Sequence, residues 1–120
     1  MKKRFIVEFG TGADLHGGNV TKAAGKALRD AISHCCLTGL AEVANVQDSV
    51  NNLFIEVKIA TPNKEALNVE EALKSLPPYR NITVEVVDGG MTVRGMHAPG
   101  LGEGDTITIV NAAITVSLGD

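Results

Sequence analysis

Two ionisable side chains, Asp14 and His16, stand among the glycines of a segment that spans residues 10–18. A carboxylate beside an imidazole can act as an acid/base pair, because it fixes the ring tautomer and favours the protonated ring. The same two side chains are also ligands of divalent metals. We therefore predict catalytic roles for both, or a metal site. The plain alternative is that Asp14 caps the turn and His16 bonds to the backbone.

Two known phosphate-binding motifs do not fit this segment. Leu15 stands where a dinucleotide fingerprint has its third glycine, and no Gly-Lys-Ser/Thr sequence follows as in a Walker A loop. The segment instead joins a predicted strand to a predicted helix. Open α/β sheets place their ligands at such junctions.

A second set of candidates lies further along the chain. Lys58 shares a strand face with Glu56, where it forms either a surface ion pair or, if partly buried, a base. The stretch from residue 88 to 105 contains six glycines and is predicted to be a functional flap or a mobile surface loop. Within it, Arg94 could hold an anionic group of a substrate, and His97 a proton or a metal.

The remaining histidine and the two cysteines have plainer interpretations. His34 falls at the edge of the apolar stripe of a helix and is interpreted as a core histidine, with a ligand role as the alternative. Cys35 and Cys36 are adjacent and lack zinc-binding spacing, so they are interpreted as small helix hydrophobes.

The elements that must position these groups follow from periodicity and from the turn residues. Asn19 is the predicted N-cap of the first helix, whose buried stripe contains several alanines and whose opposite face carries Lys22, Lys26 and Arg29. The expected order is a strand over 3–9, a connection over 10–18, a helix to about 37, an extended piece or loop over 40–52, a strand over 53–60, a helix over 64–76, a strand over 81–87, and one or two strands over 106–118 broken near Asn111.

This order predicts an α/β fold in a single domain over residues 1–120, with one mixed sheet and two helices on one face. The other sheet face would carry charged and apolar side chains together, namely Arg4, Glu8, Glu56, Lys58, Thr83 and Glu85 with Ile6, Phe54 and Val87. We predict that this face packs against the same face of other copies in a homo-oligomer. The alternative is an ordinary half-exposed sheet face.

Composition restricts the classes of partner. The chain has 120 residues, a net charge of −3 and only 3% aromatic residues, so neither a basic surface for nucleic acid nor stacking platforms are expected. The longest early apolar run, Phe5-Ile6-Val7, is too short for a secretory signal, and no run approaches a membrane span. We predict a cytoplasmic protein without nucleic-acid or membrane partners.

The pattern Gly-x-Gly-x-Asp-x-His-Gly at residues 10–17 resembles a conserved-hypothetical family of bacteria and plants, and the likeness covers essentially the whole chain. A patchier resemblance links the chain to one repeat unit of the ring-opening amidohydrolases, the cyanuric acid hydrolase and barbiturase group. That resemblance implies a catalytic role for Lys58, a second catalytic position at Asp88, substrate contacts at Gly89 and Gly90, and a chorismate-mutase-like trimer. Asp88 replaces a serine of that group, which places the group's Ser-Lys chemistry in doubt.

The sequence is compatible with three functions. The first is an enzyme, hydrolase-like on a cyclic amide or a similar polar metabolite, with its sites between subunits. The second is a metal-binding protein that uses Asp14 and His16, with His34 or His97 as a further ligand. The third is a non-catalytic oligomer that binds a metabolite.

Overall fold

A computed structural model of the chain describes residues 2–97, 100 and 104–119. It is α/β, with one mixed sheet of five strands, which confirms the predicted α/β class and the single mixed sheet. The strand order is β1-β5-β2-β3, and β4 also pairs with β5. The elements in chain order are β1 (Lys3–Asp14), α1 (Val20–Ser33), α2 (Thr38–Glu42), α3 (Ser49–Asn52), β2 (Leu53–Thr61), η1 (Lys64–Ala66), α4 (Val69–Leu73), β3 (Asn81–Asp88), β4 (Met91–Arg94) and β5 (Thr106–Leu118).

Strand β5 is the centre of the sheet. It runs antiparallel to β1 along one side, while β2 and then β4 pair antiparallel with its other side. The predicted break near Asn111 is wrong, because this residue pairs with Thr11 on one side and with Ala60 on the other. Among the described strands the one parallel pair is β2 with β3, as expected for strands joined by a helical crossover.

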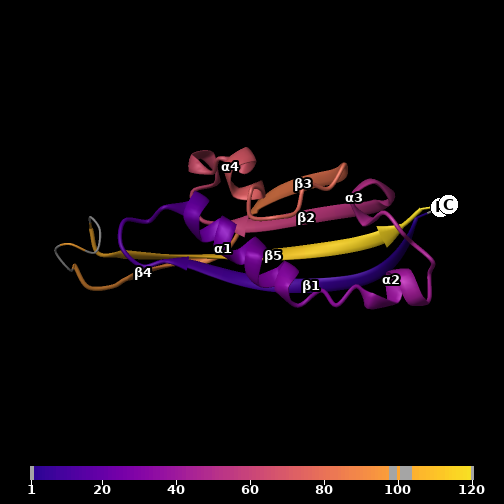
Figure 1. The fold of residues 1–120 in the computed structure, drawn as a ribbon. Helices are drawn as coiled ribbons and strands as arrows, with labels where there is room; N and C mark the ends of the chain where they lie inside the picture. Colours follow the sequence, from indigo (N-terminus) through magenta and orange to yellow (C-terminus); the bar gives the residue numbers. More distant parts are fainter. Residues whose placement is uncertain (1, 98–99, 101–103, 120) are drawn as a thin grey trace.

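The helix α1 lies across β1 and β5, with α4 beside it, on one face of an elongated sheet (Figure 1). Its N-cap is Asn19, as predicted, whose side chain accepts a hydrogen bond from the backbone N–H of Lys22. The core between the helix and the sheet is aliphatic. Its fully buried residues include Ala23, Ala24, Ala27, Leu28 and Ala31 of α1, Leu53, Ile55, Val57 and Ile59 of β2, and Val110, Ile114 and Val116 of β5.

Glycines set how closely α1 approaches the sheet. The expected connection over 10–18 is wrong in its first half, since β1 continues to Asp14 and contains both Gly10 and Gly12. A Cβ at Gly10 would collide with the backbone of Ala27 and Ala31, and one at Gly12 with the backbone of Ala23 and Ala27. These two glycines therefore allow contact between strand and helix rather than forming a ligand loop.

The helical boundaries differ from the prediction. α1 ends at Ser33, where the His34 and Cys35 N–H groups bond three residues back instead of four, and α2 follows as a separate short helix. Residues 40–52 hold part of α2 and all of α3 instead of an extended piece. The expected helix over 64–76 is divided into η1 and α4, because Asn68 caps a new helix through the N–H of Glu71.

The start of the glycine-rich stretch is a strand. Met91–Arg94 forms β4, which pairs with Ile109 to Thr106 of β5 and makes an antiparallel hairpin. Gly90 precedes it with φ +66°, and a Cβ there would collide with the carbonyl oxygen of Ile109, so glycine is required. No helix within the described ranges is both long and apolar enough to cross a bilayer.

Candidate functional site

The predicted Asp14–His16 pair lies at the end of β1, just before α1. Asp14 Oδ2 accepts a hydrogen bond from the backbone N–H of Asn19 at 2.8 Å, so this carboxylate closes the turn that leads into the helix. This is the capping role that the sequence allowed as the plain alternative for Asp14. Its second oxygen has no hydrogen bond within the described residues and remains available for a ligand.

His16 does not follow the plain alternative. Its Nδ1 is buried and has no hydrogen-bond partner in the part of the chain that the structure describes. The hairpin end approaches the same turn, because a Cβ at Gly104 would lie 3.8 Å from Gly17 Cα. His97 belongs to this hairpin and places its Nδ1 3.4 Å from the carbonyl oxygen of Gly104. Two predicted site segments therefore meet here, although no group of three metal-binding side chains forms among the described residues.

Lys58 and Asp88, the second predicted pair, have different partners. Lys58 Nζ lies 3.4 Å from Glu85 Oε1 across the β2–β3 pair. Asp88 Oδ2 lies 3.8 Å from Lys64 Nζ at the end of β3. Gly89 donates its N–H to the Thr61 carbonyl and so continues the β2–β3 pairing by one bond. Lys58 and Asp88 do not contact each other within one chain.

The two predicted centres also lie apart. Asp14 pairs with Thr108, whereas Lys58 pairs with Ala113, five residues further along β5. At about 3.4 Å per residue this is a separation of about 17 Å along the strand. Asp14 is on the face that α1 covers, like Gly12, and Lys58 is on the opposite face. Only a second copy could bring these groups together.

Arg94, a predicted anchor for an anion, pairs with Asp105 across the base of the hairpin. Its Nε lies 3.1 Å from Asp105 Oδ2, and its side chain is 89% exposed. The guanidinium thus braces β4 against the start of β5 and keeps its other N–H donors in solvent.

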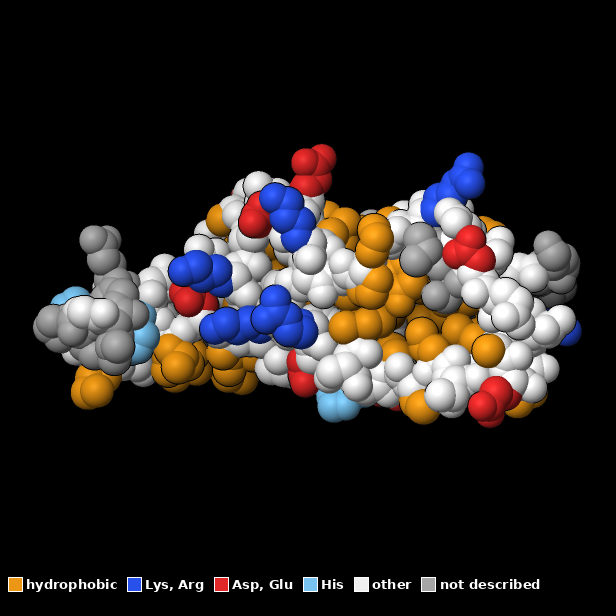
Figure 2. All heavy atoms as spheres, in the orientation of Figure 1, with side chains coloured by type: hydrophobic (Ala, Val, Ile, Leu, Met, Phe, Trp, Pro, Cys, Tyr) orange, Lys and Arg blue, Asp and Glu red, His pale blue; other side chains and the backbone are white. Residues whose placement is uncertain are grey.

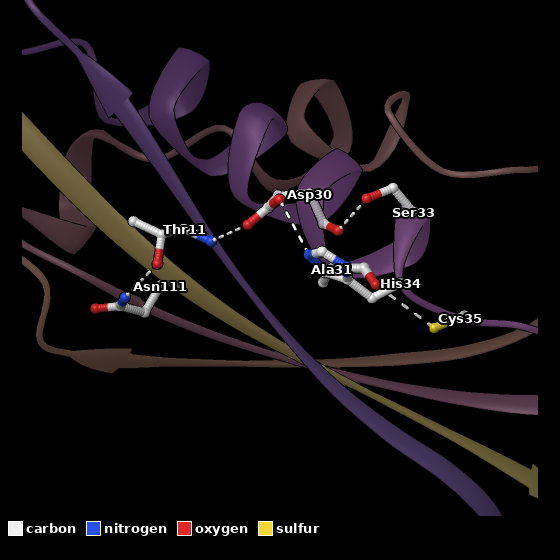
Figure 3. A network of polar contacts seen from close by, with 7 residues as sticks. All are labelled: Thr11, Asp30, Ala31, Ser33, His34, Cys35 and Asn111. Atoms are coloured by element: carbon white, nitrogen blue, oxygen red, sulfur yellow. Dashed lines mark hydrogen bonds and ion pairs between the residues drawn. The ribbon is translucent and has the colours of Figure 1, made fainter.

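A polar network that sequence reasoning missed holds α1 to the outer edge of β1 (Figure 3). Asp30 Oδ2 accepts the Thr11 N–H at 2.9 Å, and Thr11 Oγ1 accepts a hydrogen bond from Asn111 Nδ2. Asp30 Oδ1 lies 3.3 Å from His34 Nε2. The interpretation of His34 as a core histidine is wrong, since it is exposed at the helix end, where it serves as a partner of Asp30.

The sheet face opposite α1, which we call the open face, divides into two halves. What we call the apolar band consists of two groups of exposed side chains, Val7 and Phe9 on β1 and Met91 and Val93 on β4. The Thr11–Asn111 pair lies between the two groups along the sheet. The half over β2 and β3 is charged and contains a hollow of about 360 Å³, the charged groove, lined by Glu56, Lys58, Thr83, Glu85, Ala113 and Thr115.

This division corrects the predicted face of β1. A register shift between Arg4 and Ile6 changes the alternation, so that Phe9 points to the open face. Glu8 shares the helix-covered face with Gly10. The alternation in the sequence carries no sign of such a bulge, so it predicts the wrong side of the sheet for Glu8.

A family model described as "Conserved hypothetical protein (Lin0512_fam)" matches residues 4–116, which include the Asp14–His16 segment. The chain belongs to this family. The expected membership in a conserved-hypothetical family is thereby confirmed.

The Lin0512_fam chain is also similar to a solved structure. A crystal structure of an FtsZ-like protein of unknown function from Nostoc punctiforme is 40% identical, with a TM-score of 0.86 over 99% of this chain and 98% of the other. No curated protein matches the chain.

The two cysteines of this Lin0512_fam chain are both free thiols. Burial raises the pKa of the Cys35 thiol, and the nearby carboxylate of Glu8 raises it further. Hydrogen bonds from the Thr38 side chain and backbone lower the pKa of the exposed Cys36 thiol. The two neighbours therefore differ in the fraction of reactive thiolate at a given pH.

Proposed function

We propose that the chain is a homo-oligomeric protein that binds a small polar molecule where copies meet, and that the open faces of the sheets form these contacts. The observation that carries this proposal is the apolar band. Phe9 is 68% exposed although it lies within a strand, and Val7, Met91 and Val93 extend the same band. Exposed apolar side chains gathered on one face of a sheet mark interaction sites in soluble proteins.

The face is large enough for a stable contact. The Cα atoms span 51 by 23 Å in the two longest directions, so a rectangle of about 1,200 Å² encloses the projected open face. A typical stable interface buries about 800 Å² on each partner. A contact of that size would cover most of the open face, and we propose that the charged groove lies at its edge.

Charged side chains in the groove suit ligand binding better than proton transfer. Lys58 is ion-paired with Glu85, and its side chain is 58% exposed. A lysine that works as a base needs buried surroundings, which this position does not provide within one copy. We therefore favour binding of a polar metabolite over hydrolysis of a cyclic amide, for which Lys58 would be the base.

The finer features of the assembly belong to the same proposal. We propose a trimer arranged as in chorismate-mutase-like proteins, with the open faces turned toward a threefold axis and the charged groove of each copy at a seam. We also propose a cytoplasmic location, where exposed thiols such as Cys36 stay reduced.

Light scattering coupled to size-exclusion chromatography tests the assembly. The chain mass of 12.6 kDa predicts about 38 kDa for a trimer. Phe9→Asp should shift the mass toward the monomer, because it would bury a carboxylate in the contact. Val43→Asp is the matched control, since Val43 is 85% exposed in a part of the chain outside the open face and should leave the mass unchanged. A wild-type mass of one chain at micromolar concentration refutes the proposal, and a dimer refutes the threefold arrangement.

A ligand screen separates binding from catalysis. Polar metabolites, with cyclic amides and imides among them, are added while the melting temperature and the ligand concentration are followed. Binding predicts a higher melting temperature without consumption of the ligand, and Lys58→Ala should abolish the shift while the oligomer mass stays the same. Consumption that stops in Lys58→Ala would establish the enzyme instead.

The orphaned nitrogen of His16 favours a second candidate function, the binding of a divalent metal. The imidazole Nδ1 lacks a protein partner, and Asp14 offers one oxygen without a hydrogen bond two residues before it. Titration with Zn²⁺ followed by calorimetry should show one site per chain that His16→Ala removes. Equal binding by the wild type and the variant refutes this candidate.

A further inference from the structure

Helix α1 carries a row of cations on its solvent side, beside the hollow between α1 and α4. Lys22, Lys26 and Arg29 are spaced four and three residues apart, so they lie on one side of the helix. The row is visible as blue side chains across the middle of the molecule (Figure 2). The whole chain has a net charge of −3, so this row is a local positive region on a chain that is negative overall.

The cations line a hollow, which we call the basic groove, with a volume of about 260 Å³ between α1 and the end of α4. Thr21 and Ser75 add hydroxyl groups to its walls. The two sides are tied together, because Thr21 Oγ1 accepts the backbone N–H of Asn68 at 3.0 Å. Gly25 forms the floor, where a Cβ would lie only 2.9 Å from Ser75 Oγ.

Most of the positive charge in the basic groove is uncompensated. Its one carboxylate, Glu71, pairs with Lys74 at 2.9 Å. Lys26 Nζ donates to the Ala13 carbonyl at 3.0 Å, which fixes the direction of that side chain without neutralising it. Lys22 and Arg29 have no ion pair among the residues that the structure describes.

We propose that the basic groove binds the phosphate group of a phosphorylated small molecule. Lys22, Arg29 and the nearby hydroxyl groups supply donors for the several oxygens of a phosphate, and Arg29 can bind two of them at once. Lys26 adds positive charge beside the groove, although its ammonium is directed to the Ala13 carbonyl. The hollow is slightly smaller than the ~300–1,000 Å³ typical of pockets for drug-sized ligands, so it fits a phosphate with a small attached group. An acidic chain with one short basic row favours a small anion over a nucleic acid.

This site is separate from the open face, because α1 lies on the other side of the sheet. It would work in a single copy and needs no second chain. The binding of phosphate and the self-association of the open faces can therefore fail independently.

The test uses the full chain with three probes: inorganic phosphate, pyrophosphate and ribose 5-phosphate. Two-dimensional ¹H–¹⁵N NMR should show shifts confined to the groove, and calorimetry should give an affinity that falls as salt is raised. Stronger binding of ribose 5-phosphate than of inorganic phosphate would establish an organic phosphate as the ligand. The reverse order would assign the site to free phosphate or pyrophosphate.

Three variants complete the test. Lys22→Ala combined with Arg29→Ala should weaken binding at least tenfold, while Arg80→Ala, which removes an exposed cation outside the groove, should bind like the wild type. Gly25→Ala keeps every charge but turns the Ser75 hydroxyl away, and it should weaken binding several-fold. Absence of binding at millimolar phosphate, equal binding by the double variant, or equal binding by Gly25→Ala overturns the proposal. Binding of a DNA duplex without binding of the small probes also overturns it, in favour of a polyanion surface.

Discussion

Replacing Gly12 by alanine places a methyl group where β1 and α1 touch. The new Cβ would collide with the carbonyl oxygen of Ala23 and the backbone nitrogen of Ala27, and it would lie 2.8 Å from Lys26 Cβ. The first two of these neighbours belong to the backbone of a helix, which cannot rotate out of the way as a side chain can. The helix must therefore move away from the sheet as a unit.

The magnitude follows from what that movement disrupts. Overpacking a well-packed core costs about 1–3 kcal/mol, and rigid neighbours on the helix place Gly12→Ala at the upper end, at about 3 kcal/mol. A domain of this length has a total stability of roughly 6–18 kcal/mol. The expected fall in melting temperature is about 10 °C.

Urea unfolding followed by circular dichroism measures the effect, with Gly39→Ala as the control. The Cβ added at Gly39 would lie 3.2 Å from Phe5 Cζ, the far end of a side chain that can shift, so we expect a change below about 1 kcal/mol. If Gly12→Ala and Gly39→Ala have the same free energy of unfolding, the glycines of β1 do not set the position of the helix.

Two further predictions concern the network at the end of α1 and the thiols that follow it. Asp30→Ala should lower the free energy of unfolding by about 1 kcal/mol, because the Thr11 N–H loses its acceptor. Asp30→Asn keeps an acceptor oxygen and should lower it less. Equal losses in the two variants would contradict the role of that hydrogen bond. Cys36→Ser keeps only the Cys35 thiol, whose pKa is raised, and Cys35→Ser keeps only the Cys36 thiol, whose pKa is lowered by Thr38. Iodoacetamide should therefore modify Cys36→Ser more slowly than Cys35→Ser near pH 8, and both rates should increase with pH as more thiolate forms. Mass spectrometry gives the rates, and the reverse order would contradict the assigned environments.

The parts of the fold that depend on regular alternation were predictable. Leu53, Ile55, Val57 and Ile59 are all buried in β2, as their period of two indicated, and Asn19 caps α1. The glycines of β1 led to the wrong prediction of a connection, because glycine is common in turns. In the structure Gly10 and Gly12 instead let the helix approach the strand closely. Whether a glycine permits a turn or a close contact depends on what packs above it, which the local sequence does not contain.

The candidate site was predictable only as a set of residue types. The sequence indicated that Asp14 and His16 lie at a strand-to-helix junction, and they do. It could not show that Asp14 is engaged by Asn19 or that Lys58 faces Glu85, because both contacts depend on turn geometry and strand register. The basic row of α1 was visible in the sequence, but the groove beside it required the position of Ser75.

The central place of β5 bears on the order of folding. This strand follows all the others in the chain, yet β1, β2 and β4 each need it as a partner. Until β5 enters between β1 and β2, each of these strands has an unpaired edge and the floor beneath α1 is incomplete. The rate-limiting event should therefore be the closure of a loop of nearly the whole chain, which predicts slow folding and a transient vulnerability to aggregation.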